Sequence, residues 1–524
     1  MAAASKVCTV ILSITLVLGI IVAALGGAMF PVFKQIIHDK IVQQTMLKNG
    51  TAGYEVWKDP TADVYMQFWV WNLTNPDEVQ AGKEPNLSES GPYTYREVMV
   101  KGNIAANRNG TISYEQEKSY ILDLDLSVGD PRIETFTTIN IPLMTTAAMF
   151  YHLPLKTFVK GLMKDAPVFQ SHTVEEMIWG YPDPLTAAAH LAGLAPYAKF
   201  GLFVGRNNSN DGIYTVYSGV NTDDTGKINY ITRWKGQSEL PYWSTPDANM
   251  INGSDGSYNP PFFDKNKMLY VFSSDICRSI NAVFEKDTDV RDIATWRYVG
   301  PPAAFANATE NPANAGFCTP SASYCLPSGL LNVSNCQFGA PIVMSLPHFL
   351  YCDKAKVIDL VHGVVPNKEV HQTFFDIEPL TGGPINIAKR LQINVHMQPY
   401  DFPDQLKDLE SLFLPVVWLN ESALLTDSGA DQLKTQVETP VMITTIVKWS
   451  VLILGVVMVA VAVTGLTIQW IMEPINPSLV HNVENSVNAT HSGVQAGPGE
   501  AAFDPDHNRV TSHQGDTERS PLLA

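Results

Sequence analysis

Two strongly apolar segments without a charged side chain, residues 7–33 and 449–472, constrain this chain more than any other feature. They are 27 and 24 residues long, and each exceeds the roughly 20 apolar residues with which an α-helix crosses a bilayer. A cleavable signal peptide is the alternative for the first segment. Its apolar stretch is about twice as long as a signal h-region, and no small-x-small cleavage site follows it. We therefore expect two transmembrane helices, with residues 34–448 as one large loop on one side of the membrane.

Two features of the sequence, the positions of its lysines and its glycosylation sequons, disagree about the side of the membrane on which this loop lies. Lys6 precedes the first segment, whereas Lys34, Lys40 and Lys48 follow it, so the positive-inside rule weakly favours a cytosolic loop. That rule applies to short loops, however, and long domains are translocated largely regardless of charge. Against it, nine N-x-S/T sequons are spread along the loop, at Asn49, Asn72, Asn86, Asn109, Asn207, Asn252, Asn307, Asn332 and Asn420. This spread favours a glycosylated luminal or extracellular domain, with residues 1–6 and 473–524 in the cytosol.

The number and spacing of the cysteines favour disulfide bonds, and hence an oxidising compartment. Five of the six lie within 76 residues: Cys277, Cys318, Cys325, Cys336 and Cys352. They form no C-x-x-C motif and no Cys/His spacing suited to zinc, so no metal site is expected. Five cysteines in a lumen predict two disulfides and one remaining thiol, which stays free or pairs between molecules. Cys8 lies inside the first apolar segment, where it is either acylated or lipid-facing.

Between the apolar segments the pattern is mainly that of β-structure. Short alternating, β-branched or aromatic stretches recur at Val64–Trp71, Tyr93–Val100, Ile213–Gly219, Ile228–Trp234, Lys267–Ser273 and Leu391–Met397. Clusters of Gly, Pro, Asn and Asp separate them, which is typical of a multi-stranded antiparallel sheet or barrel. Nothing resembles an interdomain linker, so we expect one domain. The tail from Asn476 is polar and typical of a disordered segment.

Residues 142–198 depart from this pattern and predict a small helical bundle. A first helix is expected from Pro154 to about Lys164, since proline is well suited to a first helical turn. Its apolar stripe comprises Leu155, Phe158, Val159, Leu162 and Met163. Thr173 and Glu176 form a capping box for a second helix. Asp183 and Pro184 begin a third.

Two sets of side chains in this bundle are candidate binding residues. Lys156, Lys160 and Lys164 recur every four residues and form a basic stripe, which is either a solvated face or a docking surface. Its partner would be an anion such as an oxidised lipid, a lipoprotein or an acidic protein. His152, His172 and His190 lie in the same segment and are either ordinary residues or a pH-sensing cluster.

Eight short strings occur in order along the chain: WNLTNP, GPYTYRE, GLFVGRNNSNDG, SSDICRSI, SLPHF, DIEPLTG, KRLQIN and PVVWLNES. Through them the chain resembles the class B scavenger receptor family, the fatty-acid translocase and lysosomal integral membrane protein group. The resemblance implies an antiparallel β-barrel-like ectodomain with a helical bundle at its membrane-distal apex. It also implies an internal apolar tunnel through which sterol or fatty acid passes toward the membrane.

The resemblance carries further expectations for particular residues. It implies that Cys277 pairs with Cys336 and Cys318 with Cys325, which leaves Cys352 free. SHTVEEMIWGY at Ser171–Tyr181 is most similar to the lysosomal member, whose apical bundle carries an acid hydrolase and releases it on acidification. His172 matches a histidine of that member by position. The preceding HLPLKTF stretch matches less well, so hydrolase carriage is less secure than family membership.

The tail ends in a further motif. Glu518, Leu522 and Leu523 fit an acidic dileucine signal, acid-x-x-x-Leu-Leu, which binds a cytosolic coat adaptor. This motif predicts delivery to late endosomes and lysosomes, with residence at the plasma membrane as the alternative.

An enzyme is the competing hypothesis. Asp123 and Asp125 form a D-x-D motif, which in Golgi glycosyltransferases holds a metal-bound sugar nucleotide. The surrounding ILDLDL alternates with period two, which predicts instead that both carboxylates face one side of a strand. No hydrolase, protease or nucleotide-binding motif is found. A pI near 5.1 and a net charge of −17 argue against nucleic-acid binding.

The sequence thus predicts an α+β membrane protein without enzymatic activity or cofactor. Transmembrane helices at 7–33 and 449–472 flank a large antiparallel β-barrel-like luminal domain, 34–448, with an apical helical bundle at about 142–198. We expect a scavenger-type receptor of late endosomes and lysosomes. Its expected partners are the membrane, lipids such as sterol, fatty acid or phospholipid, a lysosomal hydrolase, a coat adaptor and a second copy of the chain. The alternatives are a cell-surface lipoprotein or fatty-acid receptor, a passive glycan-coated membrane protein and a Golgi glycosyltransferase.

Overall fold

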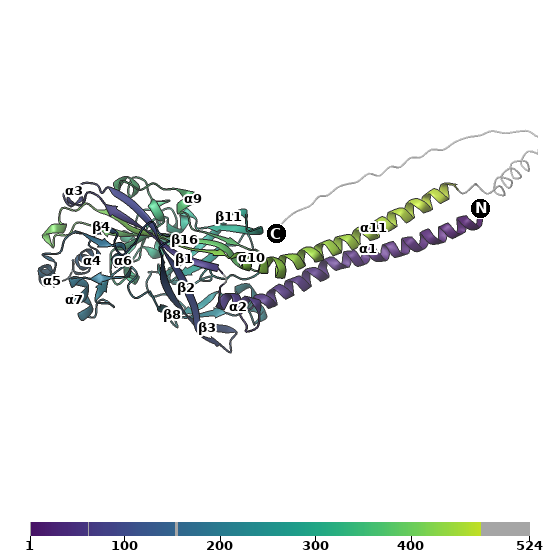
Figure 1. Cartoon of the computed structure of the whole chain (residues 1–524), viewed down its shortest axis with the longest axis horizontal. Helices are drawn as coiled ribbons and strands as arrows, with labels where there is room; N and C mark the ends of the chain where they lie inside the picture. Colours follow the sequence, from purple (N-terminus) through teal and green to yellow (C-terminus); the bar gives the residue numbers. More distant parts are fainter. Residues whose placement is uncertain (1, 61, 152, 154–155, 473–524) are drawn as a thin grey trace, which may run out of the picture. The chain divides into compact units, whose positions relative to one another are not determined.

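The computed structural model describes residues 2–60, 62–151, 153 and 156–472, which form two compact units. The larger unit is Ala28–Lys448, and the smaller one contains the described residues before Ala28 and from Trp449 onward. The long helices α1 (Ala2–Thr45) and α11 (Thr439–Met472) each contribute to both units. Figure 1 shows these helices and the elements of the larger unit. The fold is therefore mixed α+β, as the sequence predicts.

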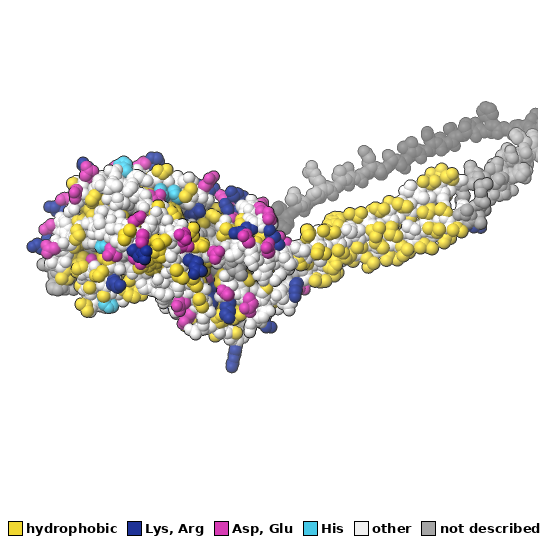
Figure 2. All heavy atoms as spheres, in the orientation of Figure 1, with side chains coloured by type: hydrophobic (Ala, Val, Ile, Leu, Met, Phe, Trp, Pro, Cys, Tyr) yellow, Lys and Arg dark blue, Asp and Glu magenta, His cyan; other side chains and the backbone are white. Residues whose placement is uncertain are grey.

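In the smaller unit, α1 and α11 pack directly on each other through glycines. A Cβ atom on Gly26 would lie 2.6 Å from the backbone nitrogen of Leu452, and one on Gly455 would lie 2.3 Å from that of Ala23. Small residues of this kind allow the backbones of membrane helices to approach closely. The face of the pair seen in Figure 2 is covered by hydrophobic side chains. Both helices are long and apolar enough to span a membrane, and they contain the two apolar segments, 7–33 and 449–472.

The larger unit is built on one antiparallel sheet. Its main path runs in the order β10-β11-β12-β15-β16-β17-β1-β2-β3-β8-β9, and β14 pairs with both β16 and β13. The bounds are β1 (Ala62–Leu73), β2 (Leu87–Ala106), β3 (Thr111–Asp123), β8 (Ser209–Tyr217), β9 (Ile231–Trp234), β10 (Leu269–Ser273), β11 (Arg278–Val290), β12 (Ile293–Val299), β13 (Leu331–Asn332), β14 (Ile342–Ser345), β15 (Phe374–Ile377), β16 (Pro384–Met397) and β17 (Leu412–Leu425).

The sheet curls until its two edge strands are nearly joined. Ile231 of β9 donates its backbone N–H to the carbonyl oxygen of Gly253 at 2.8 Å. The next residue, Ser254, accepts from the backbone N–H of Phe272 in β10 at 2.8 Å. A two-residue segment therefore connects the edges, which leaves few strand groups without a partner. The result is the nearly closed, barrel-like sheet that the family resemblance implies.

The central strands differ in how their two faces are covered. In β1 buried and partly buried positions alternate, which is typical of a strand with one face in the core. In β17 every position from Leu412 to Asn420 is buried. Such a strand has both faces covered and reads as a continuous apolar run. The same run includes Asn420, which bears on its expected glycan below.

Four helices lie together at one end of the larger unit, as Figure 1 shows: α4 (Ile141–Phe150), α5 (Lys156–Met163), α6 (Val174–Trp179) and α7 (Pro184–Leu191). Helix α4 packs against α5 and α7. At the opposite end of the unit lie α2 (Ala52–Lys58) and α10 (Asp427–Leu433), while α3 is a short turn at Pro76–Gln80. Trp179 joins the bundle to the sheet, because its ring packs against Tyr95 of β2 at 5.3 Å and Phe68 of β1 at 6.4 Å.

Several local predictions are confirmed and others need correction. The capping box of Thr173 and Glu176 is formed, and Asp183 caps α7 by accepting from the N–H of Thr186. Helix α5 begins at Lys156 and ends at Met163, and Pro154 lies outside the described residues. The prediction that Asp123 and Asp125 share a strand is wrong. Strand β3 ends at Asp123, whose carboxylate caps the turn by accepting from the N–H groups of Asp125 and Leu126.

Candidate functional site

The most prominent candidate site is a cavity of about 250 Å³ enclosed by the curled sheet. Strands β1, β2, β3, β8, β10, β14, β16 and β17 contribute side chains to it. Because side chains alternate along a strand, one face of β16 supplies five of them, Ile385, Ile387, Lys389, Leu391 and Ile393. Most of the lining is apolar, so the cavity can hold an apolar molecule.

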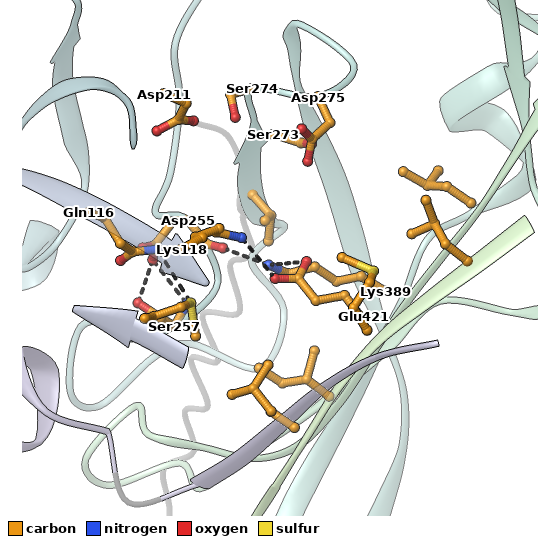
Figure 3. A pocket seen from close by; sticks show the side chains of 18 of the residues that line it. Gln116, Lys118, Asp211, Asp255, Ser257, Ser273, Ser274, Asp275, Lys389 and Glu421 are labelled. Carbon is orange, nitrogen blue, oxygen red and sulfur yellow. Dashed lines mark hydrogen bonds and ion pairs between the residues drawn. The ribbon is translucent and has the colours of Figure 1, made fainter. Parts of the chain in front are cut away.

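A cluster of four charged residues lies at this lining, and three of them, Lys118, Lys389 and Glu421, are part of it. Lys118 of β3 places Nζ 2.7 Å from Glu97 Oε1 and 3.3 Å from Glu421 Oε1. Lys389 of β16 approaches the other oxygen of Glu421, Oε2, at 3.4 Å, and donates to the backbone carbonyl of Asp255 at 3.2 Å. Both lysines therefore meet on one carboxylate (Figure 3). We call Glu97, Lys118, Lys389 and Glu421 the ionic cluster.

The strand order explains how these residues meet. Lys389 and Glu421 face each other across β16 and β17, and Glu421 faces Met66 of β1. Lys118 comes from β3, which β1 and β2 separate from β17 in the sheet. Its side chain therefore reaches over the inner face of those two strands to contact Glu421. The cluster thus links distant walls of the same curled sheet through the cavity.

Burial and charge act in opposite directions on these groups. Burial raises the pKa of Glu97, whose side chain is 0 % exposed, and Lys118 offsets that effect only in part. Burial also opposes the charge on Glu421, but Lys118 and Lys389 together lower the pKa of Glu421 to about 2. Burial alone would lower the pKa of Lys118, yet Glu421 and Glu97 raise it well above its usual value. Glu421 and Lys118 therefore remain charged, whereas Glu97 is the group most ready to take up a proton.

A second pair of interacting groups consists of Lys101, which is buried, and Asp255, which lines the cavity. Burial lowers the pKa of Lys101, which lies over the rings of Trp57 and Tyr114. Burial would raise the pKa of Asp255, but Lys101 and the hydrogen bonds from Ser257 lower it. These two opposite charges balance each other.

The predicted lysine stripe is only partly present. Lys156 begins α5, but its side chain lies outside the described part of the structure. Lys160 pairs with Asp404 at 2.8 Å, so its charge is already matched by an acid from a distant loop. Lys164 follows the end of α5 and lines a separate polar cleft together with Asp77 and Gln405. The three lysines therefore do not continue along one helical face, because the helix ends before the third.

The three histidines also have different environments. His172 stacks on Tyr181 with ring centroids 3.6 Å apart, and its Nδ1 lies 3.6 Å from Glu176 Oε2. Burial lowers the pKa of His172, and Glu176 opposes this only in part. His190 lies in the last turn of α7, is exposed, and has Nδ1 2.9 Å from the carbonyl oxygen of Ala195. His152 lies outside the described residues.

The cysteines pair as the family resemblance implies. Disulfides join Cys277 to Cys336 and Cys318 to Cys325. Cys352 is a free thiol whose pKa is raised by burial, and Cys8 is free and exposed.

The sequons differ in accessibility. The side chains of Asn49, Asn86, Asn109 and Asn207 belong to exposed residues, and those of Asn72, Asn252, Asn307 and Asn332 are partly buried. Asn420 differs from the other eight sequons of the loop. Asn420 is 8 % exposed, and its Nδ2, the atom to which a glycan is attached, donates to Gln67 Oε1 at 3.1 Å. The predicted sorting residues Glu518, Leu522 and Leu523 lie outside the described residues.

The ionic cluster was not identified from the sequence. Its members are ordinary charged residues of separate strands, and the partners are up to 324 positions apart, from Glu97 to Glu421. One feature of the sequence does point to a buried charge. In INIAKRLQI the residues at alternate positions are Ile385, Ile387, Lys389, Leu391 and Ile393, so a lysine occupies an otherwise apolar strand face.

Comparison with known proteins places this fold in a family. The CD36 family model matches residues 17–466. Lysosome membrane protein 2 of Mus musculus is 38% identical over 460 residues, which is 87% of this chain and 93% of the relative. Lysosome membrane protein 2 of Homo sapiens is 38% identical over 462 residues, 87% of this chain and 93% of the relative. Scavenger receptor class B member 1 of Sus scrofa is 32% identical over 426 residues, 80% of this chain and 82% of the relative. The chain therefore belongs to the CD36 family.

Proposed function

We propose that this chain is a scavenger-type receptor of late-endosomal and lysosomal membranes, and not an enzyme. It takes lipid into its internal cavity, passes sterol or fatty acid toward the bilayer, and binds lipid or protein cargo at its apical helices. The names of its relatives, lysosome membrane protein 2 and scavenger receptor class B member 1, support a receptor of this kind. Both chain termini are cytosolic in this proposal.

The apolar cavity is the observation that carries the proposal. At one end it is lined by Ala62 and Ile385, which lie at the beginnings of β1 and β16, and by Ala423 near the end of β17. Strand β17 ends at Leu425, and α10 and then α11 follow directly along the chain. The apolar lining thus continues to the residues that precede the second apolar helix. We infer that a lipid leaves at this end, where the chain continues from β17 through α10 into α11.

Filling the cavity tests this function. Ala423 lies between Val64 and Ile387 across the neighbouring strands, and all three line the cavity. Ala423→Phe should occupy part of the cavity and reduce labelling of the full-length protein by photoreactive sterol and fatty-acid probes. The matched control is Leu424→Phe, because Leu424 is the next residue of β17, is 41% exposed and faces away from the cavity. Equal labelling of both variants and the unmodified protein would contradict the proposal.

Cellular location separates the lysosomal receptor from a cell-surface receptor. The acidic dileucine at Glu518, Leu522 and Leu523 supports delivery to late endosomes and lysosomes through a coat adaptor. Replacing Leu522 and Leu523 by Ala should move a tagged full-length protein from lysosomes to the plasma membrane, as seen by microscopy with a lysosomal marker. If both versions remain at the cell surface, the alternative of a lipoprotein or fatty-acid receptor is favoured.

The apical helices are the proposed binding surface for cargo, including an acidic lipoprotein or a lysosomal hydrolase. The support for this part is the basic segment around α5, although Asp404 already neutralises Lys160. Replacing Lys156, Lys160 and Lys164 together by Glu should abolish binding of an anionic cargo to the full-length protein. Replacing the exposed Lys286 of β11 by Glu should leave binding intact. Unchanged binding in the triple variant would assign the three lysines to the solvated surface.

A further inference from the structure

The ionic cluster is an unusual feature for a cavity that only passes neutral lipid. Its four side chains carry two positive and two negative charges, and they lie among Met66, Leu391 and Leu419. Placing ionised groups in an apolar interior is unfavourable unless they have a full set of partners. In the ionic cluster some donors and acceptors have no partner, and the kind of group that could pair with them indicates what the cavity would bind.

Both lysines have a spare donor at the same place. An ammonium group carries three N–H donors. Lys118 contacts two carboxylates, Glu97 and Glu421, and Lys389 contacts Glu421 and the Asp255 carbonyl. Each therefore has at least one donor without a partner among the described residues. Their side chains are 29% and 30% exposed, and both line the cavity. Because they sit on the two oxygens of one carboxylate, their spare donors are close enough to reach one head group.

The Glu97 carboxylate, in turn, has too few positive and hydrogen-bonding partners. Glu97 has one cation, Lys118, which it shares with Glu421. The Lys118 contact is short enough for an ion pair but lies outside hydrogen-bond angles, and Glu97 Oε2 has no hydrogen-bond partner among the residues that the structure describes. Glu97 is thus a fully buried carboxylate whose one nearby cation, Lys118, is shared with a second carboxylate. When it takes up a proton, the ionic cluster changes from neutral to a net charge of +1.

We propose that Lys118 and Lys389 form a head-group subsite that selects long-chain amphiphiles with a single negative charge over neutral lipids, with Glu97 taking up the balancing proton. This inference rests on the proposed lipid-binding function and names its preferred ligand class. The anionic head accepts one N–H from each lysine. The hydrocarbon chain lies along the apolar residues of β16, such as Ile385 and Ile387.

The groups around Glu97 set the direction of its pH dependence. The charged or titratable residues that act on it are Lys118, Glu421 and Lys389, and Tyr120 lies beside it on β3. Lys101 and Asp275 interact with Lys118, and Asp255 interacts with Lys101. Burial raises the pKa of Glu97, so it gains its proton as the solution is acidified. An anion binds the protonated state better, and its affinity therefore increases as the pH falls. For uptake of one proton the increase is at most about tenfold per pH unit.

The test compares two probes with the same tail. A hexadecyl sulfonate stays ionised at pH 7.4 and 5.0, and hexadecanol stays neutral at both. Each competes with a photoreactive sterol for the full-length protein in phosphatidylcholine nanodiscs, and the half-maximal competing concentration is measured. For the unmodified protein, sulfonate should compete at least about tenfold better at pH 5.0 than at pH 7.4. Hexadecanol should compete equally at both values.

Four variants assign this preference to residues. Lys389→Met should weaken sulfonate competition by about tenfold, the worth of one charge-assisted hydrogen bond, and leave hexadecanol within about threefold. Glu97→Gln should make sulfonate compete at pH 7.4 as it does at pH 5.0. Glu421→Gln should strengthen sulfonate binding, because it removes the internal competitor for both lysines. Lys286→Met, on the exposed side of β11, is the control and should change nothing.

The outcomes separate this inference from the proposed function. If no sterol, alcohol or sulfonate binds the unmodified protein, lipid binding itself fails. If all three bind, but Lys389→Met weakens sulfonate and hexadecanol equally or Glu97→Gln retains the pH dependence, the head-group subsite is refuted and lipid binding stands. Retained hexadecanol binding shows that a variant is folded. Should Lys389→Met lose it, Lys389→Arg decides instead: it keeps the charge and must keep the preference for sulfonate.

Discussion

At the scale of single residues, a family-like motif can serve the fold and not the ligand. Asp376 belongs to the DIEPLTG string, and its side chain is 0 % exposed. Arg297 donates to its two oxygens from Nε at 2.7 Å and from Nη2 at 2.6 Å, and Asn386 donates at 3.2 Å. This carboxylate joins β12, β15 and β16. It lies outside the cavity lining, so its role is to hold the wall of the sheet.

Asp376→Asn should therefore destabilise the protein without changing ligand preference. Removing one partner from a buried ion pair leaves the other charge uncompensated and lowers the free energy of unfolding by about 3–5 kcal/mol. Thermal unfolding of the full-length protein in detergent measures this loss. The control is Asp287→Asn, because Asp287 is 70% exposed where it pairs with Lys265 at 2.7 Å. An exposed pair contributes about 1 kcal/mol or less. Equal losses in both variants would contradict the structural role of Asp376.

His172 gives a residue-scale prediction about pH. Burial lowers its pKa below that of a free histidine, and its Nε2 has no hydrogen-bond partner among the described residues. The unfolded chain therefore binds the proton more readily than the folded one. The contribution of neutral His172 to stability is fully present above pH 6.5 or so, and it is lost as the pH falls through that value toward the lowered folded pKa. Acidification should loosen the segment that carries His172.

His172→Phe should remove this pH dependence. A phenyl ring can stack on Tyr181 as the imidazole does, but it takes up no proton. Amide hydrogen exchange of residues 169–182, corrected for intrinsic exchange rates, should increase between pH 7.4 and 5.0 in the unmodified protein. It should change much less in the variant. The same increase in both proteins would show that another group senses the pH.

At the scale of elements, the contact between α1 and α11 depends on glycine. Gly26→Val should separate the helices, since a Cβ there would lie 2.6 Å and 2.7 Å from the backbone N and Cα of Leu452, which cannot move aside as a side chain can. Gly27→Val is a close control: it is the next residue of α1, and a Cβ there has no atom within 4 Å. Cysteines at positions 12 and 465, in a Cys8→Ser background, report the contact, because a Cβ on Gly465 would lie 2.9 Å from the Leu12 side chain. Oxidative cross-linking should fall sharply in Gly26→Val only.

The elements also show what a sequence can and cannot predict. The strand at Val64–Trp71, the capping box at Thr173 and the helix after Asp183 depend on neighbouring residues, and these predictions are confirmed. The end of β3 was missed, because ILDLDL keeps its alternation past the point where Asp123 turns the chain. Helix α4 has an ordinary start signal in Asn140, which accepts from the N–H of Leu143, but the prediction from the sequence does not include this helix. The ionic cluster was beyond reach, since its members meet only when β3 and β17 curl toward each other.

At the scale of the whole molecule, the apolar cavity and the ionic cluster together determine which lipids the proposed receptor would bind. The sheet is curled enough to enclose apolar space, yet Lys118, Lys389 and Glu421 of the ionic cluster line that space. A wholly apolar cavity would not distinguish a fatty acid from a sterol except by shape. In the proposed subsite the ionic cluster adds a distinction by charge, and Glu97, whose pKa is raised by burial, makes that distinction depend on pH. A receptor that cycles between these compartments would thus hold an acidic lipid most tightly in the more acidic one.

The proposed sidedness of the membrane also makes a prediction for the whole chain. Glycans are attached only on the luminal side, so every occupied sequon must lie in residues 34–448. Asn49, Asn86, Asn109 and Asn207 are exposed and should be occupied in protein from animal cells, as measured by glycopeptide mass spectrometry. Asn420 should be empty because it is buried in β17, and Asn488 should be empty because the tail is cytosolic.

Two substitutions distinguish the reasons for these empty sites. Asn86→Gln should remove one glycan and lower the apparent mass of the protein on a gel. Asn420→Gln should leave that mass unchanged, yet lower the thermal stability, because Asn420 Nδ2 donates to Gln67 between β17 and β1. A glycan on Asn420 would mean that this part of β17 is open when the chain is glycosylated. Glycans on Asn488 with none on the four exposed sites would place the domain in the cytosol and reverse the topology on which the lysosomal receptor depends.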